Sequence, residues 1–587
     1  MLAVLKGDRR YETMIDTPRS MRPHRPASVL ALALLLAAAC APAGPSQPSA
    51  LSPQSSSAPK RIVAAIKGDP PTLSDAVNSA GAGGTDGLNE VEHIVHAGLA
   101  VVDGDGRLAP RLAEAVPSLE NGLWRVLPDG RMETTFKIKP DARWHDGAPF
   151  TADDLVFTAG VAQDRQVSIV RDSAYESVES VEAVDAATVL VRWKGAYIEA
   201  DSLFSSTPGS RVLPMPRHLL ERAYAEDRAG LTQLAYWSVE FVGLGPYRLR
   251  EWALGSHLVL EANDRYVLGR PRVDQIEIRF ILDSTTMVAN VLAGAVDVTL
   301  GRGLSLEQGL QARDQWPSGR MESTLAGWTA LFPQFLGPNP PFVADLQFRR
   351  AVLHALDRQY LSDSLQAGLS PIAHSIIGPG EPEYAEIERS VVRYDYDPRR
   401  ATALLESLGL IRGADGAVRD QAGQRIVLEV RTTRDDLRER LIHPVGDYWR
   451  QVGIGMDPVI IPTQAASDRQ YRATFPAFEL TRQPTDLRRY HGSGVPLPEN
   501  SFRGNNRVRY VSQEYDTLFE RYLSTIPRAE RTQALGQIVQ HMTDRLVTLG
   551  IFYTVEPSLV SSRLVNVAGR KGESSRQPWN VHEWDLR

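Results

Sequence analysis

Cysteine is almost absent from this chain, because Cys40 is the only one among 587 residues. A single cysteine forms no intramolecular disulfide. Long runs of lysine or arginine are also missing, and 65 basic against 71 acidic residues give a formal net charge of −6. Nothing supplies the cationic surface that a nucleic-acid backbone requires. We therefore expect no nucleic-acid partner.

The common catalytic sequence signatures are missing as well. The chain has no G-x-S-x-G, no G-x-x-x-x-G-K-[ST], no H-E-x-x-H, and no G-x-G-x-x-G after a strand. His93 and His96 have the spacing that places two imidazoles on one helix face for a metal. No third ligand is identifiable, so a packed or surface histidine pair is favoured. We predict no catalytic residue, metal or cofactor, and an enzyme whose residues converge only in the folded chain stays an alternative.

No apolar segment of the body is long enough to span a bilayer, and the longest run lies near the N-terminus. Val29 to Ala39 is an uninterrupted apolar stretch of eleven residues, too short for a core of about 30 Å at 1.5 Å per residue. Arg22 and Arg25 precede it and small residues follow it, as in a secretory signal. Residues 1–20 contain three acidic residues that suit no such signal, so we expect translation to start at Met21.

Residues 21–40 resemble a bacterial lipoprotein signal, in which the thiol of the final cysteine, here Cys40, is lipidated and becomes the mature N-terminus. The alternative is a chance cysteine inside a cleaved signal. Residues 41–59 are rich in Pro, Ser and Ala, with no charge and one large apolar residue, so they form no core and serve as a tether. Extended, they reach at most about 65 Å. The sequence predicts export and a lipid anchor on the cell membrane, in the periplasm or on the outer surface.

The whole chain is 43% hydrophobic. Apolar residues of the body recur at both the helical and the strand period, which indicates α/β structure in several domains. Alternation of apolar with other residues predicts strands over 132–138 and 276–282. A Thr151-x-x-Asp154 cap predicts a helix starting there, and Asp397-Pro398 predicts another that stops at Gly409. Apolar stripes at helical spacing run over 348–356, behind Asp345, and over 535–549.

Several blocks of the body resemble family 5 extracellular solute-binding proteins, the peptide and nickel type that deliver ligand to ABC importers. The most specific is FKIKPDARWHDGAPFTADDLVFT, followed in family order by GLGPYRLREW, LAGAVDV and NPPFVADLQFRRAVLHALDRQYL. The resemblance runs from about residue 62 to 570. It implies a two-lobed periplasmic-binding-protein clamshell (type II-like) with an extra domain inserted in the first lobe. The expected parts are lobe 1 over 60–103, 240–328 and 555–587, the inserted domain over 104–239, and lobe 2 over 329–554.

Within the specific block, His145 and Asp146 have the chemistry of an acid–base pair. A tight turn between a strand and a helix explains the same residues, with Gly147 supplying the permissive backbone and Asp146 a turn hydrogen bond. In the family this segment is structural, so we favour the turn.

The resemblance implies that the protein captures a peptide or similar small solute between its lobes and passes it to an ABC permease as a monomer. In many relatives a segment with a Trp and then an Asp binds the ligand's ammonium group. Here PAFELTRQPTDLRRY occupies its place, with Arg482 near the Trp position and Asp486 near the Asp. We expect these two, Trp328 on a crossover strand, and Asn89 before a helix to contact ligand. A ligand-sensing receptor on the same scaffold, or a hydrolytic enzyme, is the alternative.

Overall fold

The computed structural model describes residues 58–78, 85–169, 172, 174–207, 212–466, 468–569 and 577–587. The predicted start at Met21, the signal, Cys40 and nearly all of the tether lie outside these residues. Residues 58–587 belong to one structural unit. In the described ranges no helix combines the length and apolarity needed to cross a membrane.

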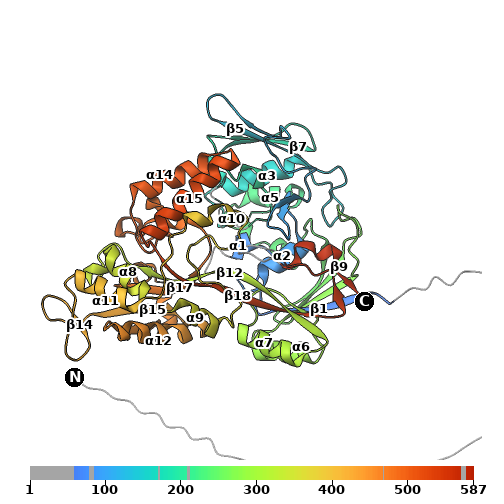
Figure 1. The fold of residues 1–587 in the computed structure, drawn as a ribbon. Coiled ribbons are helices and arrows are strands. Elements are labelled where there is room, and N and C mark those ends of the chain that lie inside the picture. Colours follow the sequence, from blue (N-terminus) through green and yellow to red (C-terminus); the bar gives the residue numbers. More distant parts are fainter. Residues whose placement is uncertain are drawn as a thin grey trace, which may run out of the picture. The chain divides into compact units, whose positions relative to one another are not determined.

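A ten-stranded sheet runs through the molecule in the order β16-β15-β17-β12-β18-β11-β1-β10-β9-β8 (Figure 1). The strands of the first lobe are β1 (Arg61–Ile66), β8 (Tyr247–Ala253), β9 (His257–Ala262), β10 (Gln275–Phe280) and β11 (Val298–Thr299). Those of the second lobe are β15 (Val427–Thr433), β16 (Gly455–Ile461) and β17 (Phe478–Gln483). The β1 strand pairs in parallel with β10 and β11, and α6 (Ser284–Leu292) supplies the crossover that this pairing needs.

Two long antiparallel strands, β12 (Gly319–Pro333) and β18 (Leu549–Ser561), pass from one lobe to the other. At one end β18 pairs with β11 of the first lobe, and at the other β12 pairs with β17 of the second. Their register shifts between Leu325 and Trp328. Such an irregularity bends a strand and increases its twist, so the bend lies midway along the strands that join the lobes.

Helices cover both faces of the first-lobe strands. The β1 strand is buried on both faces, as expected of a parallel strand between two layers. On one side, α2 (Leu88–Val95) buries Val91 in the same hydrophobic core as Ile62. On the other, α6 and α7 (Leu306–Gln315) pack Met287 and Ala312 against Ala65.

A separate four-stranded sheet, β4-β5-β7-β6, comes from the chain between β1 and β8, so it belongs to the inserted domain. Its strands are β4 (Trp124–Val126), β5 (Met132–Lys137), β6 (Val178–Ala183) and β7 (Thr188–Trp193). Burial alternates along β5, as the sequence predicts. The helix α3 (Ala152–Gln163) begins at the predicted cap, where Thr151 N–H donates to Asp154 Oδ2 at 2.9 Å. The lobe and domain boundaries given above stay a prediction.

The segment around His145 is a turn, as the favoured interpretation predicts. Gly147 has φ +94°, a left-handed angle that suits glycine, and Asp146 Oδ1 accepts from the N–H of Ala148 at 3.0 Å. His145 Nδ1 accepts from Gly243 N–H at 3.1 Å, and Nε2 donates to Gly245 O at 3.0 Å. Burial lowers the pKa of His145 to about 4. Both ring nitrogens therefore hold the turn against the strand that leaves the inserted domain.

The second lobe also has helices on both faces. Its lower layer in Figure 1 contains α9 and α12, and α14 and α15 lie above the sheet, on the same side as α2. The helices of this lobe are α8 (Leu346–His354), α9 (Arg358–Leu365), α10 (Tyr384–Ile387), α11 (Pro398–Ser407), α12 (Asp436–Gln451), α13 (Arg469–Ala473), α14 (Gln513–Ser524) and α15 (Arg528–Asp544). The remaining short elements are α1 (Asp75–Asn78), α4 (Ala174–Ser177), α5 (Arg217–Glu226), β2 (Ala100–Val102), β3 (Leu108–Pro110), β13 (Ile411–Arg412), β14 (Val418–Arg419), β19 (Leu564–Val565) and β20 (Asp585–Leu586).

The predicted helices at Asp345 and Asp397 are confirmed, and both aspartates cap them. The stripe over 535–549 was wrong in its last turn. The helix α15 ends at Asp544, and Leu546 has φ +45°, which turns the chain into β18 at Leu549. The apolar spacing continues past the helix because Leu546 and Leu549 are still buried, in the core of the second lobe.

Candidate functional site

Three of the four predicted ligand contacts lie together where the crossing strands enter the second lobe. Trp328 on β12 pairs in register with Gln483 at the end of β17. Arg482 precedes that residue, and Asp486 follows it in the next turn. Asn89 lies in the first lobe, within the first turn of α2 and not before the helix as predicted, because the helix already begins at Leu88 after Gly87. The structure thus places the four on both sides of the boundary between the lobes.

Trp328 is buried, with 1% of its surface exposed. Its ring meets Phe332 edge-on at 6.0 Å between centroids, and a Cβ on Gly550 of β18 would lie only 2.9 Å from the ring. Among the described residues its indole Nε1 has no hydrogen-bond partner. A buried donor of this kind costs about 1–3 kcal/mol while it is unpaired, so Nε1 is suited to donate to a ligand.

Arg482 takes part in a chain of charges that spans the boundary. Its Nε donates to Ala326 O at 2.5 Å, and its Nη2 lies 2.9 Å from Glu556 Oε1 on β18. The same carboxylate lies 3.0 Å from Nε of Arg302, which follows β11 in the first lobe. Glu556 therefore links an arginine of each lobe, and Arg482 holds the crossing strand whether or not it also contacts a ligand.

Asp486 starts η7 (Leu487–Tyr490), where its Oδ1 accepts from Arg488 N–H at 3.0 Å. Its other oxygen lies 3.7 Å from Arg489 Nε. About 35% of its side chain stays exposed. A carboxylate with open surface at this edge can accept further hydrogen bonds, as an ammonium group would require.

Asn89 lies where α2 approaches the loop after β11. A Cβ on Gly301 would lie 2.8 Å from the backbone of Gly87, so the two segments touch. The carbonyl of Asn89 accepts from His93 Nδ1 at 2.7 Å. Its Oδ1 is buried and has no hydrogen-bond partner within the described ranges. Asn89 therefore offers a buried acceptor on the first-lobe side.

The histidine pair is packed, as favoured from the sequence. His96 Nδ1 accepts from Leu244 N–H at 3.1 Å, and its Nε2 donates to Pro214 O at 2.9 Å. Burial lowers the pKa of His96 to about 3. Neither of its nitrogens is available to a metal, and the described part of the chain contains no cluster of His, Cys, Asp and Glu placed to hold one.

The lobes also touch away from the crossing strands. Arg488 of η7 lies 2.7 Å from Glu199 Oε2 in the inserted domain, and Ile198 N–H donates to Leu523 O of α14 at 3.1 Å. Burial alone would lower the pKa of Arg488, but Glu199 and Tyr197 hold it above its usual value. We call this contact the rim contact. Sequence reasoning missed it because Glu199 and Arg488 are 289 positions apart and only Arg488 lies in a segment that the resemblance singles out.

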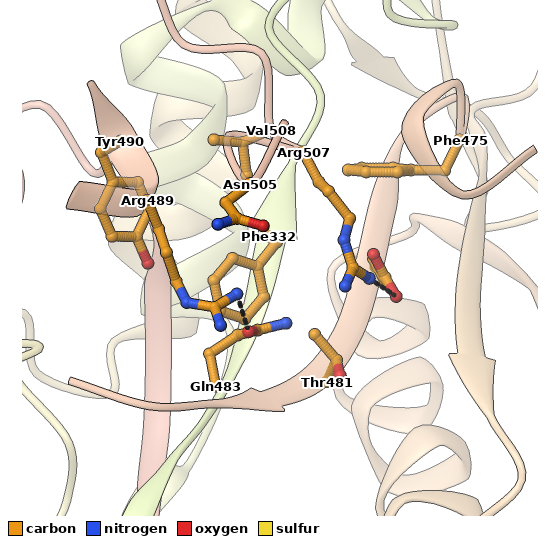
Figure 2. A pocket seen from close by; sticks show the side chains of 10 residues that line it. Phe332, Phe475, Thr481, Gln483, Arg489, Tyr490, Asn505, Arg507 and Val508 are labelled. Atoms are coloured by element: carbon orange, nitrogen blue, oxygen red, sulfur yellow. Dashed lines mark hydrogen bonds and ion pairs between the residues drawn. The ribbon is translucent and has the colours of Figure 1, made fainter. Parts of the chain in front are cut away.

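A narrow cavity lies beside β17 within the second lobe (Figure 2). Figure 2 shows Arg489 and Arg507 on opposite sides of it, with Thr481 and Gln483 of β17 between them. Its volume is about 20 Å³, which is room for one or two water molecules. This cavity is too small for a peptide. It is lined by Phe332, Phe475, Glu479, Thr481, Gln483, Arg489, Tyr490, Asn505, Arg507 and Val508.

The sequence model of "Bacterial extracellular solute-binding proteins, family 5 Middle" matches residues 108–486, more than half of the chain. The chain belongs to this family. The family 5 protein described here is 24% identical to the oligopeptide-binding protein AppA of Bacillus subtilis, over 88% of this chain and 90% of AppA.

Solved structures agree with the sequence comparison. AppA of Bacillus subtilis in complex with a nonapeptide superimposes with a TM-score of 0.68 at 22% identity, covering 90% of this chain and 100% of that one. NikZ from Campylobacter jejuni in complex with Ni(L-His) gives a TM-score of 0.69 at 20% identity, covering 89% of this chain and 99% of that one. The predicted two-lobed α/β clamshell is thereby confirmed for this family 5 protein.

Proposed function

We propose that this protein is the substrate-binding component of an ABC importer, which encloses a peptide or similar small solute between its lobes and delivers it to a membrane permease. Family membership makes it an extracellular solute-binding protein. The observation that carries the proposal is a pair of buried polar atoms without a hydrogen-bond partner among the described residues. Trp328 Nε1 belongs to a ring packed in a core cluster of the second lobe, and Asn89 Oδ1 lies on α2 of the first lobe. A ligand that satisfies both atoms binds the closed form better than an open one, and such a difference is what drives closure.

The ligand class rests on the relatives and on the charges at the boundary. Asp486 is suited to an ammonium group, and arginines stand beside it. AppA carries a nonapeptide and NikZ a nickel–histidine complex. A solute with an amino and a carboxylate group shares the chemistry of both. We therefore propose an amino-acid-derived solute, with a peptide as the first candidate.

We propose that the ligand leaves unchanged. The one acid–base candidate in the sequence is committed to structure, since both nitrogens of His145 bond backbone groups and Asp146 contacts His218 at 2.8 Å. Export and a lipid anchor at Cys40 complete the proposal, because a tethered monomer stays close to its permease. They are supported by the apolar run, the small residues and the tether in the sequence.

Mass spectrometry of solute released from the purified protein, followed by calorimetry with that solute, tests this function. We expect one solute per chain, recovered chemically intact, and a smaller radius of gyration by X-ray scattering when it is bound. Asn89→Ala and Trp328→Phe should each weaken binding about tenfold, as expected for one lost hydrogen bond of about 1.5 kcal/mol.

Trp449→Phe is the matched control for the indole. Trp449 is equally buried in the second lobe, but its Nε1 donates to Val352 O at 3.0 Å within the core. Its substitution should leave solute affinity unchanged. Recovery of a converted solute would favour an enzyme instead, and wild-type affinity in both boundary variants would refute the site.

A further inference from the structure

A second hollow lies in the second lobe at the end of β17 remote from the lobe boundary. We call it the arginine pocket; it has a volume of about 350 Å³. Glu479 at this end of β17 pairs with Phe332, whereas Gln483 at the boundary pairs with Trp328. Four residues of strand separate the two, about 13 Å. The arginine pocket therefore lies toward the end of the strand away from Gln483, and it shares Asn505 and Arg507 with the narrow cavity. It is lined by Ala466, Arg469, Arg472, Ala473, Pro496, Phe502, Arg503, Gly504, Asn505 and Arg507.

The lining of the arginine pocket is strongly cationic. It contains four arginines and no acidic residue. The carboxylate directly beneath is Glu479, which pairs with Arg472 and lies 3.8 Å from Arg507. Four positive charges against this one leave a local excess of +3. Asp468, next to Arg469 in the chain, accepts instead from Tyr471 N–H at 3.0 Å, where it caps α13.

Two of these arginines are held in place from within the protein. Only 13% of the Arg472 side chain is exposed, and its Nε is buried without a hydrogen-bond partner among the described residues. Burial lowers the pKa of Arg507, Glu479 opposes that effect, and repulsion from Arg472 adds to it. Burial and mutual repulsion both destabilise guanidinium groups that are held close together. An added anion stabilises them by pairing with their charge.

The other two arginines complete the lining of the arginine pocket. Arg469 and Arg503 are exposed, and in the described part of the chain neither side chain forms an ion pair. Both residues line the arginine pocket together with Asn505. Guanidinium groups donate in pairs to adjacent oxygens, a geometry that suits phosphate. The volume is at the lower end of the range for small-molecule sites.

We propose that the arginine pocket binds a phosphate group, either as inorganic phosphate or as the phosphate of a small monoester. The dianion offsets most of the local charge excess, and its oxygens supply acceptors for Arg472 and Arg507 at the base and for Arg469 and Arg503 at the rim.

Calorimetry of the full chain with inorganic phosphate, and separately with phenyl phosphate, tests the proposal. We expect saturable binding at one site, weakened by added salt. The double variant Arg469→Gln/Arg503→Gln should lose at least tenfold in affinity, and phosphate should raise the melting temperature of the wild type but not of this variant. Both side chains are exposed, so circular dichroism should show an unchanged fold.

Arg399→Gln is the control, because Arg399 is an exposed arginine of the same lobe, in α11, away from the pocket. It should bind phosphate like the wild type. Tighter binding of phenyl phosphate than of phosphate would identify a monoester as the ligand, and the reverse order would identify free phosphate. Absence of saturable binding of both anions, or equal affinity in the double variant and the control, would overturn the proposal.

Discussion

Replacing Asp201 by asparagine should stabilise this protein at neutral pH and leave its stability unchanged in acid. Asp201 lies in η1 (Ala200–Ser202), in the inserted domain beside the rim contact. Burial raises the pKa of Asp201 to about 6, although Arg531 opposes the rise. In an unfolded chain an aspartate titrates near about 3.9. Between these values the native state binds more protons than the unfolded state.

The sign and size of the effect follow from this difference. The free energy of unfolding falls as pH rises from about 4 to about 6, because the buried carboxyl must ionise in the native state. The stabilisation from the neutral carboxyl is fully present below about pH 4 and lost above about pH 6. A rise of about two pKa units corresponds to about 3 kcal/mol. Asparagine keeps the shape without ionising, so the variant should be up to about 3 kcal/mol more stable than the wild type at neutral pH.

Urea unfolding of Asp201→Asn and of the wild type across this pH range measures the difference. Several domains need not unfold in one step, so we compare the midpoint of the same transition in both proteins. Asp363→Asn, at an exposed aspartate of α9, should show no pH-dependent difference from the wild type. A stability difference that is constant with pH, or a less stable Asp201→Asn at neutral pH, would refute the reasoning.

Three further predictions concern the rim contact, the lipid anchor at Cys40 and the turn at Gly147. Glu199→Gln should weaken solute binding roughly two- to fivefold and enlarge the radius of gyration, because its pair with Arg488 is about 41% and 33% exposed and contributes only about 0.5–1 kcal/mol after solvent screening. Cys40→Ala should abolish incorporation of labelled fatty acid in a bacterial host; incorporation into the variant would refute the anchor. Gly147→Ala should lower the free energy of unfolding by about 1–2 kcal/mol through strain at positive φ, whereas Gly160→Ala, in open space within α3, should not lower it.

Local structure could be predicted from the sequence wherever its cause is local. At Asp345 and Asp397 the aspartate side chain accepts from a backbone N–H two or three residues ahead, and at Thr151 the side chain of Asp154 accepts from the Thr151 N–H three residues behind. The residue types were therefore sufficient. The alternation along β5 likewise reflects one buried face. The stripe that ran into Leu549 failed because apolar spacing cannot distinguish a continuing helix from a left-handed turn followed by a buried strand.

The site was predictable only in part, because its contacts join distant parts of the chain. The resemblance singled out Arg482 as a ligand contact, which stays a prediction, and the structure places this residue near the lobe boundary. It could not show that Glu556, 74 positions later, pairs with this arginine. Nothing in the sequence marks Glu479 as the shared partner of Arg472 and Arg507 either, since their geometry is set by α13, β17 and the loop before α14.

The chain of charges through Glu556 limits how the lobes can move. Its partners, Arg302 and Arg482, belong to different lobes, and Glu556 lies on the strand that joins them. Separating the lobes about this strand therefore stretches at least one of the two ion pairs, while the paired strands β12 and β18 stay intact. A solute that satisfies Trp328 Nε1 and Asn89 Oδ1 adds to the same preference for the closed form. A ligand shifts a conformational equilibrium only by its difference in affinity for the two states. These two atoms should therefore determine how strongly the solute drives closure. The two ion pairs of Glu556 should determine how much of the protein is already closed before the solute binds.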